Sequence, residues 1–137
     1  MSPDIEQKIR QSFAAQAMMR TLGACLVALS DGATVIEAPI LPGSRQQHGF
    51  GHAGLTFAIG DSAAGYAALS LMPEGAEVLT TEMKINLLAP AQGERLIARG
   101  RVIKPGRRLV IVQADVHAVK EGVETHIALL TGTMIPV

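Results

Sequence analysis

Aromatic residues and cysteine are scarce in this 137-residue chain. It has no tryptophan, one tyrosine, three phenylalanines and one cysteine, yet 48% of its residues are hydrophobic. The core must therefore be built from small and aliphatic side chains, which let neighbouring backbones approach closely. A single cysteine excludes an internal disulfide and a thiolate zinc cluster, as is usual in a reducing compartment. We therefore expect a cytoplasmic protein without a structural metal.

Net charge and long apolar runs are also lacking. Twelve basic and twelve acidic residues cancel, so no overall field would attract nucleic acid or an anionic membrane. No apolar run approaches the roughly 20 residues that span a bilayer, and the N-terminus does not have the pattern of a signal peptide. The length is typical of one domain. We therefore expect a soluble protein in which residues 1–137 form a single domain.

Two segments have the pattern of helices. Apolar residues recur at helical spacing from Asp4 to Arg20, which predicts an amphipathic N-terminal helix with Ser2 or Asp4 as its N-cap. The run from Ala53 to Leu71 is too long for a strand and is apolar nearly all round. We expect this second segment to be a core helix that is buried on most sides.

Six strand-like stretches are separated by turn signals. The first two are expected to form a hairpin around Ser30-Asp31-Gly32. The last four are joined by short turns, which predicts an antiparallel meander. The arrangement is an α+β fold in which one antiparallel sheet of about six strands wraps a long central helix. The stretches are residues 22–29, 34–40, 77–88, 95–103, 108–119 and 124–135.

Asp61 is the chemical anomaly of the apolar helix. The neighbouring positions at helical spacing, 57, 58, 64 and 65, hold Phe, Ala, Ala and Gly, so Asp61 has no basic partner nearby in the sequence. Burying an unpaired carboxylate is costly. We interpret Asp61 as a pocket carboxylate that can activate water or attack a carbonyl. The alternative is a wetted helix face on which Asp61 and Ser62 are simply exposed.

The entry into the same helix is rich in glycine. Gly51, Ala53 and Gly54 leave the backbone little shielded, and a helix N-terminus presents unpaired N–H groups and the positive end of the helix dipole. These donors could hold a thioester carbonyl and stabilise an oxyanion, although an ordinary loop-to-helix turn also needs glycine. Ala53 and Asp61 lie about 12 Å apart along the helix. A site that uses both is therefore expected to need two subunits.

Other motifs give weaker signals. His48 and His52 lack a third ligand nearby, so no metal site is expected. The glycines at 49, 51 and 54 follow a polar loop instead of a strand, which argues against a dinucleotide site, and no serine-hydrolase elbow occurs. Lys104, Arg107 and Arg108 surround one tight turn and could bind phosphate, or could be ordinary solvated charges.

Taken together, these features resemble the hotdog superfamily, and especially its PaaI-like (phenylacetic acid degradation) thioesterase branch. The resemblance extends over roughly residues 46–133. It implies a hotdog fold, hydrolysis of an acyl-CoA or aroyl-CoA thioester, and no cofactor apart from the coenzyme A of the substrate. It also implies a homodimer, often a dimer of dimers and hence a homotetramer, with active sites at the subunit interface. The matching segments are 52–54, Asp61, 80–91, Gly93, 106–107 and 130–133.

The resemblance assigns catalytic roles to particular residues. Asp61 takes the place of the helical acid, which acts as nucleophile or general base, and Gln46 takes that of an amide side chain fifteen residues earlier. The backbone N–H that polarises the thioester falls on Ala53, where glycine is usual. A Ser or Thr contributed across the dimer corresponds to Thr80 or Thr81. Because residues alternate between the faces of a strand, only one of these two can serve.

The remaining assignments concern substrate binding. The resemblance places the phosphates of coenzyme A near Lys104, Arg107 and Arg108, and His52 and Gly54 are expected to contact the substrate beside the catalytic groups. Two other functions stay open. One is a non-catalytic acyl-CoA-binding module, and the other is a hotdog enoyl-thioester hydratase or dehydratase that pairs His52 with Asp61. Neither the acyl group nor the choice of CoA over acyl-carrier protein can be predicted.

Overall fold

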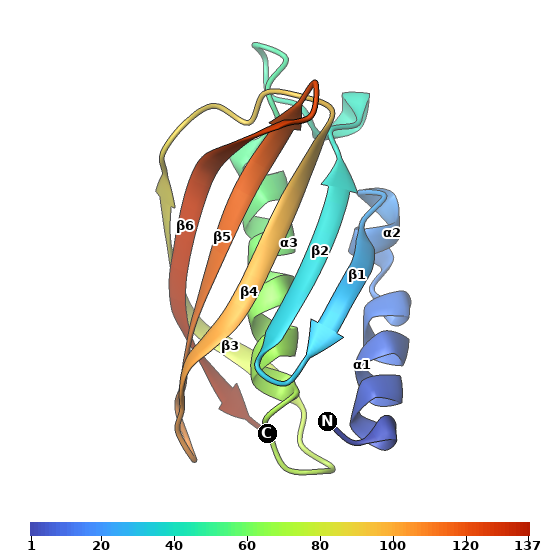
Figure 1. Cartoon of the computed structure of the whole chain (residues 1–137), viewed down its shortest axis with the longest axis vertical. Coiled ribbons are helices and arrows are strands. Elements are labelled where there is room, and N and C mark those ends of the chain that lie inside the picture. The colour runs from blue at the N-terminus through green and yellow to red at the C-terminus, as the bar shows by residue number, and fades with distance from the viewer.

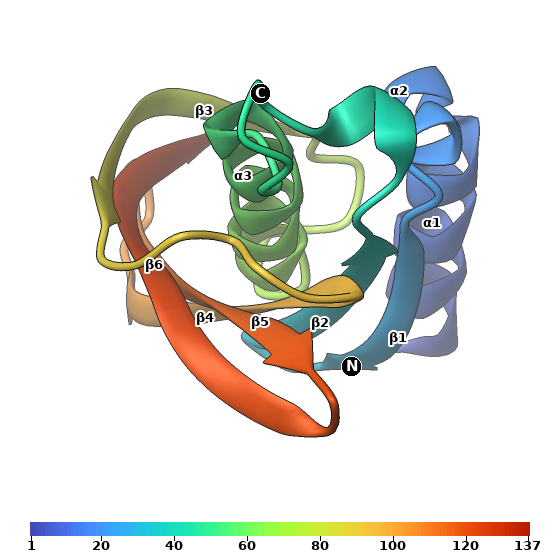
Figure 2. The ribbon, with the colours of Figure 1, turned by 90° about the horizontal axis from the view of Figure 1, so that it is seen from above.

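A computed structural model describes residues 1–137 and places one long helix, α3 (Ala53–Leu69), against the concave face of a six-stranded antiparallel sheet (Figure 1). Seen from above, the sheet curves around α3, while α1 and α2 lie beside β1 at one edge (Figure 2). This arrangement confirms the predicted α+β hotdog fold. The strands are β1 (Cys25–Ser30), β2 (Ala33–Pro39), β3 (Val78–Leu87), β4 (Arg95–Pro105), β5 (Val110–Lys120) and β6 (Val123–Pro136), in the spatial order β1-β2-β4-β5-β6-β3.

Helix α3 packs unusually close to the sheet because the contacting residues are small. Ala63 and Ala64 are fully buried. A Cβ added to Gly100 on β4 would lie only 2.5 Å from the carbonyl oxygen of Ala63, so only glycine fits at this contact. The prediction of a core helix is confirmed, although α3 ends two residues earlier than expected. No helix of the protein is both long and apolar enough to cross a bilayer.

The N-terminal segment forms two helices instead of the expected single one. α1 (Pro3–Ala15) starts after Ser2, whose hydroxyl accepts a hydrogen bond from the N–H of Ile5, and α2 (Ala17–Thr21) follows. Gln16 separates them with an extended backbone, and its side chain donates to the hydroxyl of Tyr66 on α3 at 2.7 Å. A tertiary contact thus accompanies a break that the continuous helical pattern did not reveal.

The expected hairpin of β1 and β2 is confirmed, but the expected four-strand meander is wrong. Of the last four strands, only β4, β5 and β6 follow one another in the sheet, whereas β3 pairs with β6 and occupies the far edge. The chain between β3 and β4 does not make a hairpin turn. It crosses past the start of α3, where the N–H of Gly51 donates to the carbonyl of Ala91 at 2.8 Å. The outer edge of β3 is therefore left without a neighbouring strand.

Candidate active site

The N-terminal end of α3 leaves one backbone donor free. His52 is the N-cap, and its Nδ1 accepts from the N–H of Gly54 at 2.7 Å. The carbonyl of His52 accepts from the N–H groups of Leu55 and Thr56 at 2.9 and 3.3 Å. Of the first four N–H groups of the helix, only that of Ala53 has no partner within the chain. The predicted main-chain donor is therefore available to a ligand.

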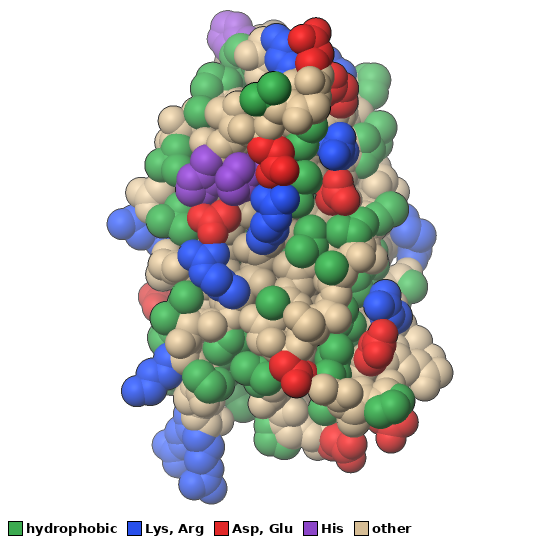
Figure 3. Space-filling model, in the orientation of Figure 1, with side chains coloured by type: hydrophobic (Ala, Val, Ile, Leu, Met, Phe, Trp, Pro, Cys, Tyr) green, Lys and Arg blue, Asp and Glu red, His purple; other side chains and the backbone are tan.

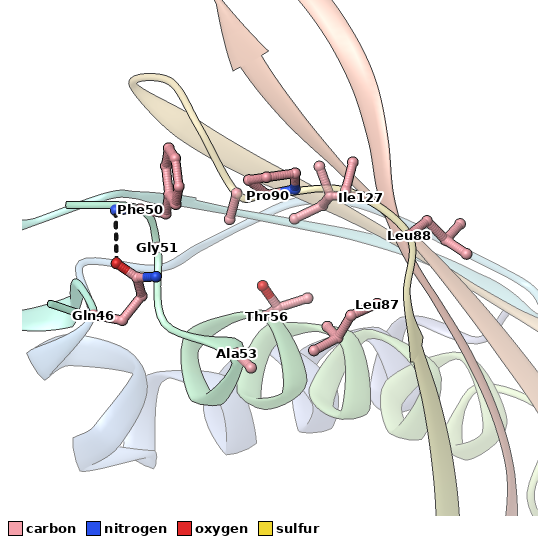
Figure 4. Close-up of a pocket in the computed structure, with 11 residues that line it drawn as sticks. Gln46, Phe50, Gly51, Ala53, Thr56, Leu87, Leu88, Pro90 and Ile127 are labelled. Atoms are coloured by element: carbon pink, nitrogen blue, oxygen red, sulfur yellow. Dashed lines mark hydrogen bonds between the residues drawn. The ribbon is translucent and has the colours of Figure 1, made fainter. Parts of the chain in front are cut away.

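Ala53 lies in a cavity of about 520 Å³ at this end of the helix (Figure 4). Gln46 lines the same cavity, and its carboxamide oxygen accepts from the backbone N–H groups of His48 and Phe50. These two bonds fix the orientation of the amide, because only its oxygen can accept. The amide nitrogen has no partner in the chain. It points toward the backbone at Gly51, which leads into Ala53 (Figure 4). The cavity thus presents two N–H donors on an otherwise mostly apolar wall.

His52 and Gly54, for which substrate contacts are predicted, form a hydrogen bond with each other at the start of α3. The ring of His52 and the N–H of Gly54 bind each other and terminate the helix. This capping is the usual way to satisfy a donor at a helix start. The N–H of Gly54 is therefore already engaged, and His52 contributes by orienting the helix start so that only Ala53 offers a free donor.

Asp61 lies in a second, separate cavity of about 280 Å³ with a more polar lining. The hydroxyl of Thr80 on β3 donates to its Oδ1 at 2.8 Å. Partial burial of the Asp61 carboxyl raises its pKa above the ordinary range, and the hydrogen bond from Thr80 opposes part of that rise. No cation forms an ion pair with Asp61. The result is a carboxylate that is more basic than usual and is oriented by a neutral donor.

A bulge in β3 decides between Thr80 and Thr81. Thr80 pairs with Met134 and Glu82 pairs with Thr133, so Thr81 is an extra residue on the bulged strand. The hydroxyl of Thr81 donates to the carbonyl of Thr133 at 3.1 Å, away from Asp61. Thr80 is therefore the threonine that contacts the helical acid.

The cationic turn directly precedes Val110, which pairs with Met134 on β6, and Met134 pairs in turn with Thr80, the hydrogen-bond partner of Asp61. Lys104, Arg107 and Arg108 are exposed, and none of them forms an ion pair. β4 starts beside the end of β2, where Arg95 pairs with Pro39, and runs roughly 30 Å to this turn. Figure 3 shows Lys and Arg side chains projecting at the lower left, where the β4–β5 turn lies in Figure 1. Within one chain the turn is thus far from Ala53.

Thr56 is a cavity residue that the sequence analysis did not single out. It lines the cavity of Ala53 and is only 1% exposed. A threonine inside an apolar helix is usually interpreted as part of the core. Its spacing of three residues from Ala53, which places both on one side of a helix, was the signal that could have identified it.

Comparison with known proteins gives a consistent result. The family model described as the thioesterase superfamily matches residues 48–125, more than half of the chain. The solved structure of a thioesterase family protein from Silicibacter pomeroyi is 47% identical to this chain. The match covers 97% of this chain and 98% of that protein, with a TM-score of 0.95.

Two structures share the fold at lower identity. The PaaI protein from the phenylacetic acid degradation operon of E. coli is 20% identical, with a TM-score of 0.85 and coverage of 97% of this chain and 93% of its own. A thioesterase from Haemophilus influenzae is 20% identical, with a TM-score of 0.82 and coverage of 92% and 86%. The chain belongs to the thioesterase superfamily and is a thioester hydrolase.

Proposed function

We propose that the protein hydrolyses acyl-CoA or aroyl-CoA thioesters at sites built from two subunits. The observation that carries this proposal is the separation of the chemical groups within one chain. The free N–H of Ala53 and the amide of Gln46 line one cavity, whereas Asp61 and Thr80 line another. Ala53 and Asp61 are about 12 Å apart along α3. A complete set of groups therefore requires a second copy of the chain.

The free edge of β3 offers a way to bring the two halves together. Val78 and Thr80, at the start of β3, line the cavity of Asp61, and Leu87, at its end, lines the cavity of Ala53. If two copies paired antiparallel through β3 about a two-fold axis, the start of one strand would lie beside the end of the other. Leu79 and Leu87 are 55% and 58% exposed on this strand, and such a pairing would cover apolar surface there.

The chemistry follows from these groups. The substrate carbonyl oxygen accepts hydrogen bonds from the N–H of Ala53 and from Gln46, which stabilise the negative charge that develops on it. Asp61 of the second copy, ionised and oriented by Thr80, either takes a proton from water as that water attacks the carbonyl carbon or attacks the carbon itself. When water is the nucleophile, the C–S bond then breaks and the proton that Asp61 took passes to the sulfur, so coenzyme A leaves as its thiol. When Asp61 is the nucleophile, coenzyme A leaves as a thiolate that takes a proton from solvent, and water then hydrolyses the mixed anhydride on Asp61 to the free acid. A hydratase would instead pair His52 with Asp61, and because Nδ1 of His52 caps α3, only its Nε2 would be left for that role.

Coenzyme A is the proposed carrier because of the turn between β4 and β5. Its three cations have no ion-pair partners and could bind the phosphates of coenzyme A by charge-assisted hydrogen bonds. The turn is next to the part of the sheet where Met134 pairs with Thr80, the partner of Asp61. In the proposed dimer it would therefore stand near the Ala53 cavity of the other copy, where the acyl group would be held.

A mixing experiment tests the two-subunit site. Asp61→Asn and Gln46→Ala are each expected to lose most of the thiol release measured with a panel of CoA esters. When the two variants are unfolded and refolded together, activity should recover to about a quarter of wild type, because half of the dimers are mixed and each has one intact site of two. No recovery, with dimers formed and both variants folded, would contradict the shared site. Mixing Asp61→Asn and Gln46→Ala after each has been refolded separately serves as the control.

A further inference from the structure

Thr56 presents a hydroxyl that nothing in the chain satisfies. The residue is 1% exposed, and its side chain forms no hydrogen bond within the protein. Every side-chain polar atom that is sealed from solvent has a partner, so the hydroxyl of Thr56 must reach the cavity. Figure 4 shows this hydroxyl pointing away from α3, toward the side of the cavity formed by Pro90 and Ile127.

This arrangement differs from the ordinary behaviour of threonine in a helix. A helical threonine often donates back to the carbonyl four residues earlier, as Thr21 does to Ala17 at 3.2 Å. Thr56 makes no such bond. A hydroxyl that faces a mostly apolar cavity without a partner in the chain is less favourable there than a valine of the same shape would be. The hydroxyl is therefore best explained by a ligand atom that binds it in the cavity.

The rest of the cavity shows what kind of ligand fits. Its other lining side chains near Thr56 are apolar and include Phe50, Leu87, Leu88 and Ile127. Thr56 stands one helical turn, about 5 Å, beyond the N–H of Ala53. A group whose thioester carbonyl is held at Ala53 would therefore bring the nearest few carbons of its acyl chain beside Thr56, with hydrocarbon against the other walls.

From this geometry we propose that Thr56 selects acyl groups that carry a hydroxyl or carbonyl oxygen close to the thioester, such as 3-hydroxyacyl groups. The inference rests on the proposed function and names the substrate class of that same site. The oxygen substituent of the acyl group forms one hydrogen bond with the hydroxyl of Thr56. An unsubstituted acyl chain leaves that hydroxyl unpaired. Sites built to bind a substrate hydroxyl discriminate against analogues that lack it for this reason.

The test compares two CoA esters of equal chain length, 3-hydroxybutyryl-CoA and butyryl-CoA. The kcat/KM of each is measured for the wild type and for Thr56→Val, which keeps the shape of the side chain and removes the hydroxyl. We expect the ratio of the hydroxylated to the plain ester to fall about tenfold in Thr56→Val, which corresponds to the loss of one hydrogen bond. Thr56→Ser should restore most of the ratio. Thr21→Val, the same change on the exposed helix α2, should leave the ratio at its wild-type value.

Two outcomes would overturn the proposal. An equal loss on both esters in Thr56→Val would mean that the hydroxyl acts on the thioester itself or on the fold. An unchanged ratio would mean that it contacts no substituent. A wild-type protein that hydrolyses neither ester would instead contradict the proposed function for these substrates. In that case the binding affinities of the same two esters would be measured by calorimetry for the wild type and Thr56→Val. They would show whether Thr56 favours the hydroxylated ester.

Discussion

Replacing Ala53 with proline would remove the proposed oxyanion donor without breaking any hydrogen bond of the chain. Ala53 is the first residue of α3, a position where proline is favoured because its N–H has no partner inside the helix. The preceding residue, His52, has φ −66° and ψ 144°, an extended conformation that proline accepts. Since the N–H of Ala53 makes no hydrogen bond in the chain, no bond is lost. The proline ring would project toward the cavity of about 520 Å³.

The expected effect on catalysis is large and the effect on stability is small. Loss of one oxyanion donor typically lowers kcat by about 100- to 1000-fold, or about 2.7–4 kcal/mol. Gln46 would still supply a second donor, so we expect the lower end of that range. The free energy of unfolding should change by less than about 0.5 kcal/mol, as for substitutions that break no contact.

Steady-state thiol release and a thermal melt together check this reasoning. Ala53→Pro should lower kcat much more than it changes KM, because the N–H is used mainly when charge develops on the carbonyl oxygen. Ala53→Val keeps the N–H while adding bulk, and so serves as the matched control. If Ala53→Pro folds normally and its kcat falls by less than about threefold, the main chain of Ala53 is not the oxyanion donor.

Two further predictions concern the acid and the helix that carries it. Thr80→Val removes the hydrogen bond that lowers the pKa of Asp61, so this pKa should rise further. The acid limb of the profile of kcat/KM against pH, which reports ionisation of Asp61, should therefore move to higher pH. A shift to lower pH would contradict the role of Thr80. Gly100→Ala places a Cβ 2.5 Å from the carbonyl of Ala63 and should destabilise the protein by about 1–3 kcal/mol, lowering Tm by about 3–10 °C. Gly65→Ala, where a Cβ has room, is the control and should be neutral or stabilising; a wild-type Tm for Gly100→Ala would show that α3 can shift without cost.

Local periodicity determined the elements of this protein well. The hairpin of β1 and β2 and the core helix α3 were predicted to within a few residues, because the pattern of apolar side chains reflects which faces are buried. The anomaly of Asp61 was also visible, since a carboxylate in an apolar helix needs an explanation wherever it occurs. The distance from Ala53 to Asp61 followed from helix geometry alone. The sequence therefore determined which elements form and indicated that the candidate site is divided.

The tertiary structure decided how those elements meet. β3 lies beside β6 because of hydrogen bonds between segments about 50 residues apart, and turn lengths carry no information about such pairing. The bulge that turns Thr80 toward Asp61, the bond from Gln16 to Tyr66 that accompanies the break after α1, and the ring of His52 that caps α3 are likewise contacts of specific geometry. Sequence patterns identify the faces that are buried, but a single bulge or cap determines which hydroxyl or N–H is left free to bind a substrate.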